Sequence, residues 1–117
     1  MRRTVLIVDD HAAFRAAARA LLEAYGFDVV GEAPDGASAL RSATELRPDV
    51  VLLDVQLPGL DGFAVAEQLA LHDGSAAIVL TSSRSVASFR RRLEANPALR
   101  FIPKSDLSGE ALAAAVG

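Results

Sequence analysis

The chain has 117 residues, of which 51% are hydrophobic, and it carries a formal net charge of −3. This length suits one domain with a buried core, and the absence of cysteine excludes disulfides, cysteine-based zinc sites and thiol catalysis. The negative charge argues against non-specific nucleic-acid binding by the whole domain, and no segment reaches membrane-spanning length.

The first predicted strand is Thr4–Val8, which ends at the acidic pair Asp9 and Asp10. The apolar run is too short for a signal peptide and meets two aspartates at once, so it indicates a core strand. Together with the lack of cysteine, which agrees with a reducing compartment, this favours a cytoplasmic location. A helix ending at Gly26 follows, and its expected buried face carries Phe14, Ala18, Leu21, Leu22 and Tyr25.

Residues 28–32 form a weaker, more polar strand, which we expect at the edge of the sheet. Asp35 is expected to cap a second helix that ends before Pro48. The next strand, Val50–Asp54, is an unbroken apolar run closed by a carboxylate, a pattern typical of a parallel strand buried on both faces. Asp61 and Gly62 open a third helix that is expected to close near Gly74. The residues expected to face inward from the two helices are Ala39, Leu40, Ala43, Val65, Ala66 and Leu69.

The pattern repeats in the last third of the chain, with a fourth strand at residues 77–81 that runs into Ser82 and a helix at about 86–95 that ends at Asn96 and Pro97. A fifth strand at 99–102 leads to Lys104, and an alanine-rich helix at about 107–116 follows. Strands that alternate with helices in this way predict an α/β fold, in which right-handed crossovers cover both faces of a parallel sheet.

Polar side chains stand at four of the predicted strand ends: Asp9 and Asp10, Asp54, Ser82 and Lys104. If the first and third strands are neighbours, these ends flank the crevice where open α/β sheets bind ligands. Two unit charges 4 Å apart interact by about 4 kcal/mol at an effective dielectric near 20. Three carboxylates therefore need a proton or a cation to offset this repulsion, and Mg²⁺ suits such oxygen ligands. Lys104 adds a positive charge opposite Asp54, and Ser82 adds a hydroxyl.

Each of these residues also has an ordinary structural interpretation. The aspartate pair could start a helix, Lys104 could be a solvated lysine, and Ser82 could form a turn. Their joint appearance at successive strand ends favours a functional site.

These residues lie in motifs that resemble those of response-regulator receiver domains, the phosphoryl-accepting half of two-component signalling. The motifs are LIVDD, VVLLDVQLPGLDGF, IVLTSS and FIPKS, with the spacing of the family. The resemblance covers essentially the whole chain, residues 1–117, as one receiver domain. It implies a doubly wound (βα)5 fold of the flavodoxin-like, CheY-like type, whose five-stranded parallel sheet has the strand order 2-1-3-4-5 with helices on both faces.

By this resemblance, Asp54 is the phosphoacceptor. Asp9 and Asp10, with Asp54 and the backbone carbonyl of Gln56, would hold Mg²⁺, with Mn²⁺ as an alternative. Lys104 would contact the phosphoryl oxygens. Ser82 would be the switch hydroxyl; Thr81 is a rival, but strand alternation points Thr81 away if Ser82 faces the site.

The implied reaction is attack of Asp54 on the phosphohistidine of a sensor histidine kinase or phosphotransfer protein. Slow hydrolysis would then reset the domain, which makes it a switch and not a turnover enzyme. Phe101 would be the switch aromatic, although it could equally be an ordinary core side chain. Its movement would remodel the face of the fourth helix, fifth strand and fifth helix, toward an output domain, a partner protein or a second copy.

Some residues depart from the family pattern or lie beside the site. Gln56 and Arg84 are expected to fringe the site and to affect the access of water. Many family members have proline after the lysine, and here Ser105 follows Lys104, which makes a cis bond there less secure. His11 and His72 lack partners at nucleophile or metal spacing in the sequence and are interpreted as surface residues. A basic group on the presumed output side is interpreted as a solvated face rather than a nucleic-acid or acidic-partner site: Arg84, Arg90, Arg91, Arg92 and Arg100.

Two other functions compete with this interpretation. A binding-only pseudo-receiver normally lacks an acidic residue or the lysine, and all are present here. A phosphohydrolase of the haloacid-dehalogenase type needs Asp-x-Asp after the first strand, where this chain has Asp9, Asp10 and His11. No P-loop, GxGxxG or GxSxG motif supports a nucleotide enzyme or a serine hydrolase. An output domain beyond Gly117 is compatible with the pattern.

Overall fold

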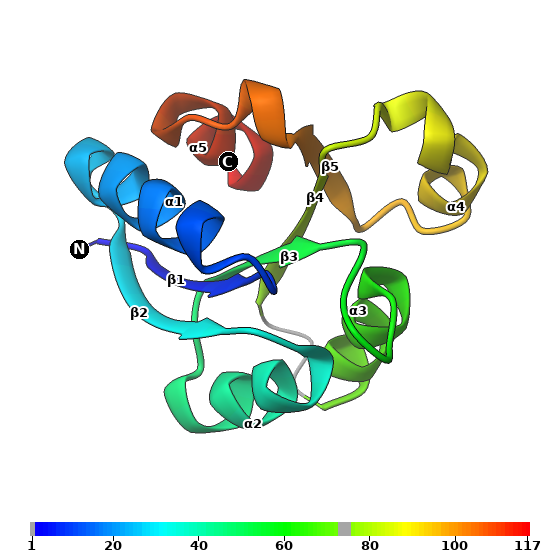
Figure 1. The fold of residues 1–117 in the computed structure, drawn as a ribbon, viewed down its shortest axis with the longest axis horizontal. Coiled ribbons are helices and arrows are strands. Elements are labelled where there is room, and N and C mark those ends of the chain that lie inside the picture. Colours follow the sequence, from blue (N-terminus) through cyan, green and yellow to red (C-terminus); the bar gives the residue numbers. More distant parts are fainter. Residues whose placement is uncertain (1, 73–75) are drawn as a thin grey trace.

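A computed structural model describes residues 2–72 and 76–117, and its strands form one five-stranded sheet in the order β2-β1-β3-β4-β5. All four strand pairings are parallel (Figure 1). The predicted α/β fold and strand order are therefore confirmed, and the polar second strand lies at a sheet edge as expected. The strands are β1 (Thr4–Val8), β2 (Asp28–Ala33), β3 (Val50–Asp54), β4 (Ala77–Ser82) and β5 (Arg100–Pro103).

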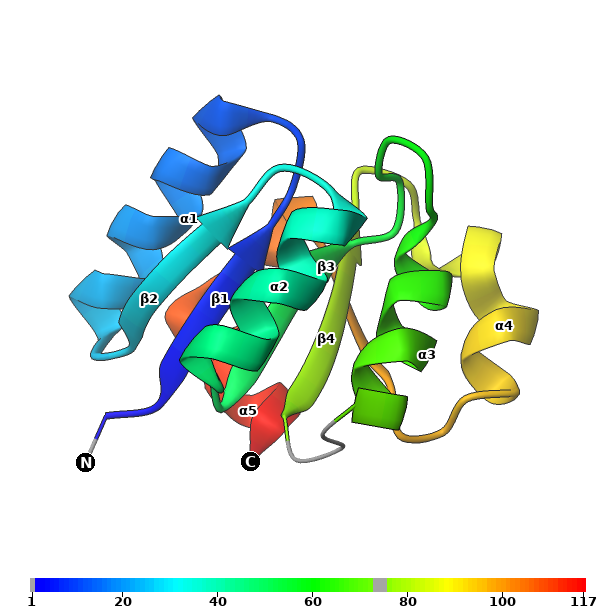
Figure 2. The same ribbon diagram turned by 90° about the horizontal axis from the view of Figure 1, so that it is seen from below.

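Helices cover both faces of the sheet. Figures 1 and 2 show α1 and α5 on one face and α2 and α3 on the other, with α4 beside α3. This arrangement follows from right-handed crossovers between parallel strands. The helices are α1 (Ala12–Tyr25), α2 (Gly36–Leu46), α3 (Gly62–His72), α4 (Arg90–Glu94) and α5 (Gly109–Val116), with short 3₁₀ helices η1 (Val86–Phe89) and η2 (Lys104–Asp106).

The central strand β3 explains why the core has two halves. Every residue of β3 is buried, and alternate side chains enter opposite layers. Val50 and Leu52 pack in the layer under α1 and α5, whereas Val51 and Leu53 pack in the layer under α2, α3 and η1. Burial of each such side chain contributes about 1.5–3 kcal/mol, so β3 holds no polar residue until its last position.

Side-chain caps begin three of the helices. Asp35 accepts a hydrogen bond from the backbone N–H of Ser38 at the start of α2, and Asp61 accepts one from Ala64 at the start of α3. Ser108 does the same for α5, which therefore begins slightly later than predicted. At the other end of α1, Gly26 takes the left-handed conformation that ends a helix. The predicted cap at Asp35, the predicted helix start at Asp61 and Gly62, and the stop at Gly26 are thus confirmed.

The single helix predicted at residues 86–95 is wrong, because the chain forms η1 and then the short α4. The junction residue Phe89 has φ −121° and ψ 9°, outside the α region. Its ring is buried and packs between those of Phe63 and Phe101. Burial of this aromatic side chain takes precedence over an uninterrupted helix.

The expected buried face of α1 is too wide. Ala18 and Leu22 are buried and Phe14 packs against the same layer, but Leu21 is 40% exposed and Tyr25 is 54% exposed. Tyr25 stacks on Phe27 at the edge of the layer. The expected end of the third helix near Gly74 lies outside the described residues, among which α3 ends at His72.

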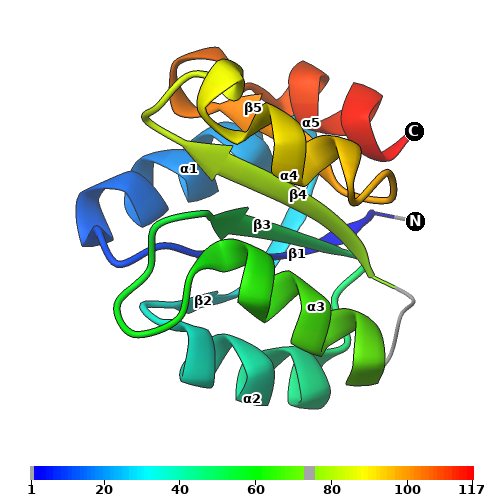
Figure 3. The same cartoon turned by 90° about the vertical axis from the view of Figure 1, so that its right-hand side faces the viewer.

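Figure 3 shows both chain termini at one end of the molecule, opposite the ends toward which β3 and β4 run. The carboxyl ends of the strands thus form a separate rim. No helix in the described ranges is both long and apolar enough to cross a membrane.

Candidate functional site

The side chains of Asp9, Asp54 and Lys104 meet at the carboxyl rim of the sheet. The Lys104 ammonium lies 2.7 Å from Oδ2 of Asp9 and 3.3 Å from Oδ2 of Asp54. Asp9 is fully buried and Asp54 is only 3% exposed. Strands β1 and β3 pair directly. Strand β4 pairs with β3 on one side and with β5 on the other, so the carboxyl ends of these parallel strands lie along the same rim. Residues far apart in the chain therefore form one charged cluster.

Asp54 is held by the tight return of the chain after β3. Its Oδ1 accepts a hydrogen bond from the backbone N–H of Gln56 at 3.0 Å, and the N–H of Gly62 donates to the carbonyl of Val55 at 2.6 Å. A Cβ atom at Gly62 would collide with the backbone carbonyl of Asp54. Only glycine permits this approach, so the loop fixes the carboxylate in place.

The three charged side chains shift one another's pKa values. Burial raises the pKa of Asp54 above its ordinary value of 3.8, and the nearby negative charge of Asp9 adds to this. Burial alone would also raise the pKa of Asp9, but the Lys104 ammonium and the N–H of His11 outweigh it and lower that pKa. Burial alone would lower the pKa of Lys104, but the two carboxylates outweigh it and raise that pKa. The cluster therefore keeps Asp9 and Lys104 as an ion pair.

The backbone of Asp9 is anchored on both sides. Its N–H donates to the carbonyl of Ala33 in β2, and its carbonyl accepts a hydrogen bond from the guanidinium of Arg15 in α1. Arg15 also pairs with Glu32 of β2. Asp9 is thus oriented by its neighbours in both α1 and β2.

The carboxylates fit a divalent cation. One oxygen each from Asp9, Asp10 and Asp54 belongs to a group of ligand atoms that all lie within 4.8 Å of one another. The Oδ2 atom of Asp9 is buried and has no hydrogen-bond partner among the described residues, although the Lys104 ammonium forms an ion pair with it at 2.7 Å. Oxygen donors of this kind suit Mg²⁺.

Two hydroxyls at the end of β4 differ in their surroundings. Ser82 is buried, and its Oγ accepts a hydrogen bond from the N–H of Arg84 at 3.0 Å. Thr81 is also buried, and within the described ranges its hydroxyl has no hydrogen-bond partner. Ser82 continues the register of Leu80, which packs in the layer under α2 and α3, whereas Thr81 follows Val79 into the opposite layer. The two hydroxyls therefore point to different sides of the sheet.

The remaining predicted residues differ in how they relate to this cluster. Gln56 and Arg84 are exposed, and each is tied to the site by its backbone N–H. Phe101 is partly buried, with its ring 5.6 Å from that of Phe89. The peptide bond between Lys104 and Ser105 is trans. The predicted basic side chains are all exposed, namely Arg84, Arg90, Arg91, Arg92 and Arg100.

His11 is a surface residue as expected, but the prediction that it lacks partners at metal spacing is wrong. Its Nδ1 lies 3.1 Å from an oxygen of Asp9 and 3.1 Å from an oxygen of Asp10, and it belongs to the same group of potential ligands. The only sequence signal was its position directly after the acidic pair, just before the first turn of α1. Phe14 is a second residue of the site that the sequence did not indicate. The Lys104 ammonium lies 4.4 Å from the centre of its ring.

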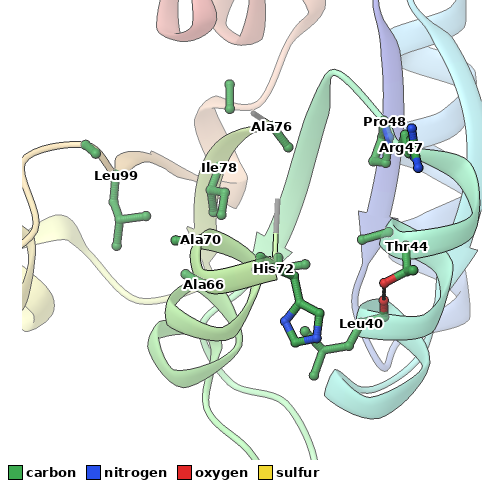
Figure 4. Close-up of a pocket in the computed structure, with 14 residues that line it drawn as sticks. Leu40, Thr44, Arg47, Pro48, Ala66, Ala70, His72, Ala76, Ile78 and Leu99 are labelled. Carbon is green, nitrogen blue, oxygen red and sulfur yellow. Dashed lines mark hydrogen bonds between the residues drawn. The ribbon is translucent and has the colours of Figure 1, made fainter. Parts of the chain in front are cut away.

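A separate cavity of about 400 Å³ lies between α2, α3 and the start of β4 (Figure 4). Leu40, Leu69 and Ile78 contribute to its mostly apolar lining, with His72 at the side of α3. None of its described lining residues is acidic. It lies away from the charged cluster and offers no site for a cation.

Comparison with known proteins agrees with this geometry. The sequence profile of the response regulator receiver domain matches residues 5–116. BvgA of Bordetella pertussis, named as a transcription regulator of virulence factors, is 35% identical over 115 residues. That match covers 98% of this chain and 55% of BvgA, so the chain spans about half the length of this relative.

Solved structures give the same result. A two-component response regulator of the LuxR family from Aurantimonas matches with a TM-score of 0.84 and 31% identity, over 97% of this chain and 82% of that one. The response regulator domain of CheB from Thermotoga maritima matches with a TM-score of 0.81 and 27% identity, over 99% of this chain and 94% of that one. The chain therefore belongs to the response regulator receiver domains, the signalling domains of two-component systems.

Proposed function

We propose that Asp54 accepts a phosphoryl group from the phosphohistidine of a sensor histidine kinase or phosphotransfer protein. One observation carries this proposal: the buried carboxylate of Asp54 ends the central strand with the Lys104 ammonium 3.3 Å away. Burial of a carboxylate costs the fold free energy, so its presence at this position favours a functional role. The proposal covers the whole chain, residues 1–117, as a receiver domain that acts in the cytoplasm.

In the proposed reaction, an oxygen of Asp54 attacks phosphorus, the bond between phosphorus and the histidine nitrogen breaks, and an acyl phosphate forms. The carboxylate is already a nucleophile when ionised, so no general base is required. The transition state is loose, and catalysis rests on positioning and on neutralising charge. Lys104 lies close enough to Asp54 to contact the phosphoryl oxygens once Asp54 is phosphorylated.

Asp9, Asp10 and Asp54, with the backbone carbonyl of Gln56, would hold Mg²⁺ or Mn²⁺. The ion would supply positive charge against the phosphoryl oxygens. The buried Oδ2 of Asp9, which has no hydrogen-bond partner among the described residues, supports this assignment. Because water then hydrolyses the acyl phosphate slowly, the domain would act as a switch and not as a turnover enzyme.

Ser82 and Phe101 would carry the signal to the surface formed by α4, β5 and α5. Leu80 pairs with Phe101 in register, and Ser82 lies two residues after Leu80, so the two side chains belong to the same face of the sheet. Thr81 is the register partner of Asp54, so Ser82 would have to turn from the layer of Phe101 toward the phosphoryl group, and this movement would free space that Phe101 can enter. The changed surface would contact an output domain, a partner protein or a second copy of the chain.

The test is to incubate the protein with Mg²⁺ and acetyl phosphate and to record its intact mass. We expect a single phosphoryl adduct that is labile to base and depends on Mg²⁺. Asp54→Ala should abolish it, whereas Asp28→Ala, at an exposed aspartate, should leave it unchanged. An adduct that persists in Asp54→Ala, or sustained turnover of unrelated phosphate esters, would refute the proposal.

A further inference from the structure

His11 places an imidazole nitrogen beside the acidic cluster, whose other potential metal ligands are carboxylate oxygens. Its Nδ1 lies 3.1 Å from Oδ1 of Asp9 and 3.1 Å from Oδ1 of Asp10. The side chain of His11 is 70% exposed, while that of Asp9 is fully buried. The imidazole therefore lies over the solvent side of the cluster and can be reached by an ion that enters from water.

These separations suit ligands that share one ion. Bonds from zinc to histidine nitrogen and to carboxylate oxygen are about 2.0–2.2 Å long, so two such ligands at a right angle lie about 3 Å apart. One ligand atom from each of Asp9, Asp10, His11 and Asp54 falls within 4.8 Å of the others. The four ligand atoms are therefore close enough together to approach one ion after small side-chain movements.

A second, independent observation points to a cation at this position. Oδ2 of the fully buried Asp9 has no hydrogen-bond partner among the residues that the structure describes. This oxygen lies 2.7 Å from the Lys104 ammonium, but a buried carboxylate oxygen without a hydrogen bond still carries a desolvation cost, which a bound cation would offset. Carboxylates alone would not show which divalent ion the site prefers, but an imidazole ligand favours transition-metal ions.

We propose that His11 is a nitrogen ligand of this site, so that the domain binds divalent transition ions such as Ni²⁺ or Zn²⁺ more tightly than carboxylates alone would allow. Carboxylates and water suit Mg²⁺ and Mn²⁺, whereas imidazole suits zinc, copper, iron and nickel. This inference deepens the proposed function, because it uses the same acidic cluster and assigns the residue that sets its metal preference.

The chain offers a matched control. It has no cysteine and only two histidines. The second, His72, is exposed on α3, and its Nδ1 lies 3.0 Å from the carbonyl of Gln68 within the same helix. His72→Ala therefore removes an imidazole of similar exposure at a place remote from the acidic cluster.

The experiment is calorimetric titration of the untagged protein with Ni²⁺ and, separately, with Mg²⁺. We expect His11→Ala to weaken Ni²⁺ binding by at least about tenfold, with a much smaller effect on Mg²⁺. His11→Asn, which keeps a polar side chain without the imidazole, should lose Ni²⁺ affinity to a similar extent. His72→Ala should bind Ni²⁺ like the parent protein, and excess Mg²⁺ should compete with Ni²⁺ if both occupy one site.

A spectroscopic readout tests ligation directly. Binding of Ni²⁺ should shift the NMR signals of the His11 imidazole strongly by paramagnetism and leave those of His72 near their original positions. Equal Ni²⁺ affinity in His11→Ala and the parent protein would overturn the inference. So would equal losses of Ni²⁺ and Mg²⁺ affinity, since His11 would then act only by arranging the carboxylates.

The two proposals fail in different ways. Parent protein that binds Ni²⁺ through His11 but forms no adduct with acetyl phosphate would refute phosphorylation of Asp54 and leave the metal ligand intact. Protein that is phosphorylated with Mg²⁺ but binds Ni²⁺ independently of His11 would refute the ligand alone.

Discussion

The ammonium of Lys104 lies closer to the carboxylate of Asp9 than to that of Asp54, at 2.7 Å against 3.3 Å. From the sequence, Lys104 was expected opposite Asp54. In the structure it is shared, and its charge lowers the pKa of Asp9 while only partly offsetting the burial of Asp54. The phosphoacceptor candidate is therefore the less well compensated of the two buried carboxylates.

This imbalance predicts that Asp54→Asn stabilises the fold at neutral pH in the absence of divalent ions. The raised pKa means that the folded protein binds a proton at Asp54 more tightly than the unfolded chain does. Ionised Asp54 thus destabilises the fold, and this cost grows as the pH rises above 3.8, the ordinary value. We expect a gain in the free energy of unfolding of about 1 kcal/mol at pH 7 that disappears near pH 3.5. Urea unfolding in a chelating buffer measures it, and an equal gain at both pH values would contradict a charge effect.

Glu32 should show the opposite pH dependence. Hydrogen bonds from Arg19, together with those from Arg15, lower its pKa below 4.5. Its ion pairs therefore contribute stability above the unfolded value and lose it as the pH falls through the folded value. Glu32→Gln should cost about 0.5–1 kcal/mol at pH 7 after allowance for partial exposure, and almost nothing in strong acid. Urea unfolding of the two proteins across this pH range is the measurement; a loss that does not depend on pH would exclude the ion pairs as its cause.

Gln56 and Arg84 are predicted to influence the lifetime of the acyl phosphate. Both side chains are exposed, and their backbone N–H groups bind Asp54 and Ser82. Substitution by alanine keeps these backbone contacts but changes the access of water. We expect altered dephosphorylation rates in Gln56→Ala and Arg84→Ala, followed by the decay of the phosphoryl adduct in intact-mass spectra. Unchanged lifetimes in both variants would count against a role for these side chains.

The unpaired hydroxyl of Thr81 should be a stability cost. It is buried without a hydrogen-bond partner in the described part of the chain, so Thr81→Val removes a desolvated polar group and keeps the shape. We expect a gain of about 1 kcal/mol in thermal or urea unfolding. The neighbouring Ser82→Ala is the matched control, since it removes the acceptor for the N–H of Arg84 and should lower stability. A loss in Thr81→Val would indicate that its hydroxyl has a partner.

Gly109 is predicted to be required for the packing of α5 against α1. A Cβ atom at this position would collide with Cβ and the ring of Tyr25. Gly109→Ala should therefore destabilise the fold by about 1–3 kcal/mol, the usual cost of overpacking. Tyr25→Ala, which empties the space, should restore much of the loss in the double variant. Additive effects in the double-mutant cycle would show that the collision is relieved elsewhere.

The order and type of most elements, and the parallel sheet, could be predicted from the residues along the chain. Short apolar runs ended by polar or turn residues are local signals, and β3 shows this well, since its unbroken apolar run matches a strand buried on both faces. Local signals also determined which residues stand at the strand ends, because each strand must stop where the chain turns. The sequence therefore predicts four of the residues at the strand ends: Asp9, Asp54, Ser82 and Lys104.

The order of residues does not reveal how these side chains share charge or which other residues join them. The preference of Lys104 for Asp9, the approach of His11 to the two carboxylates and the unpaired hydroxyl of Thr81 depend on distances between residues from different parts of the chain or on side-chain directions. The break of the fourth helix at Phe89 has the same origin, because the rings of Phe63 and Phe101 come from other elements. The hydrophobic periodicity along the chain carries no information about such packing, because it depends on contacts between side chains that are distant in the sequence.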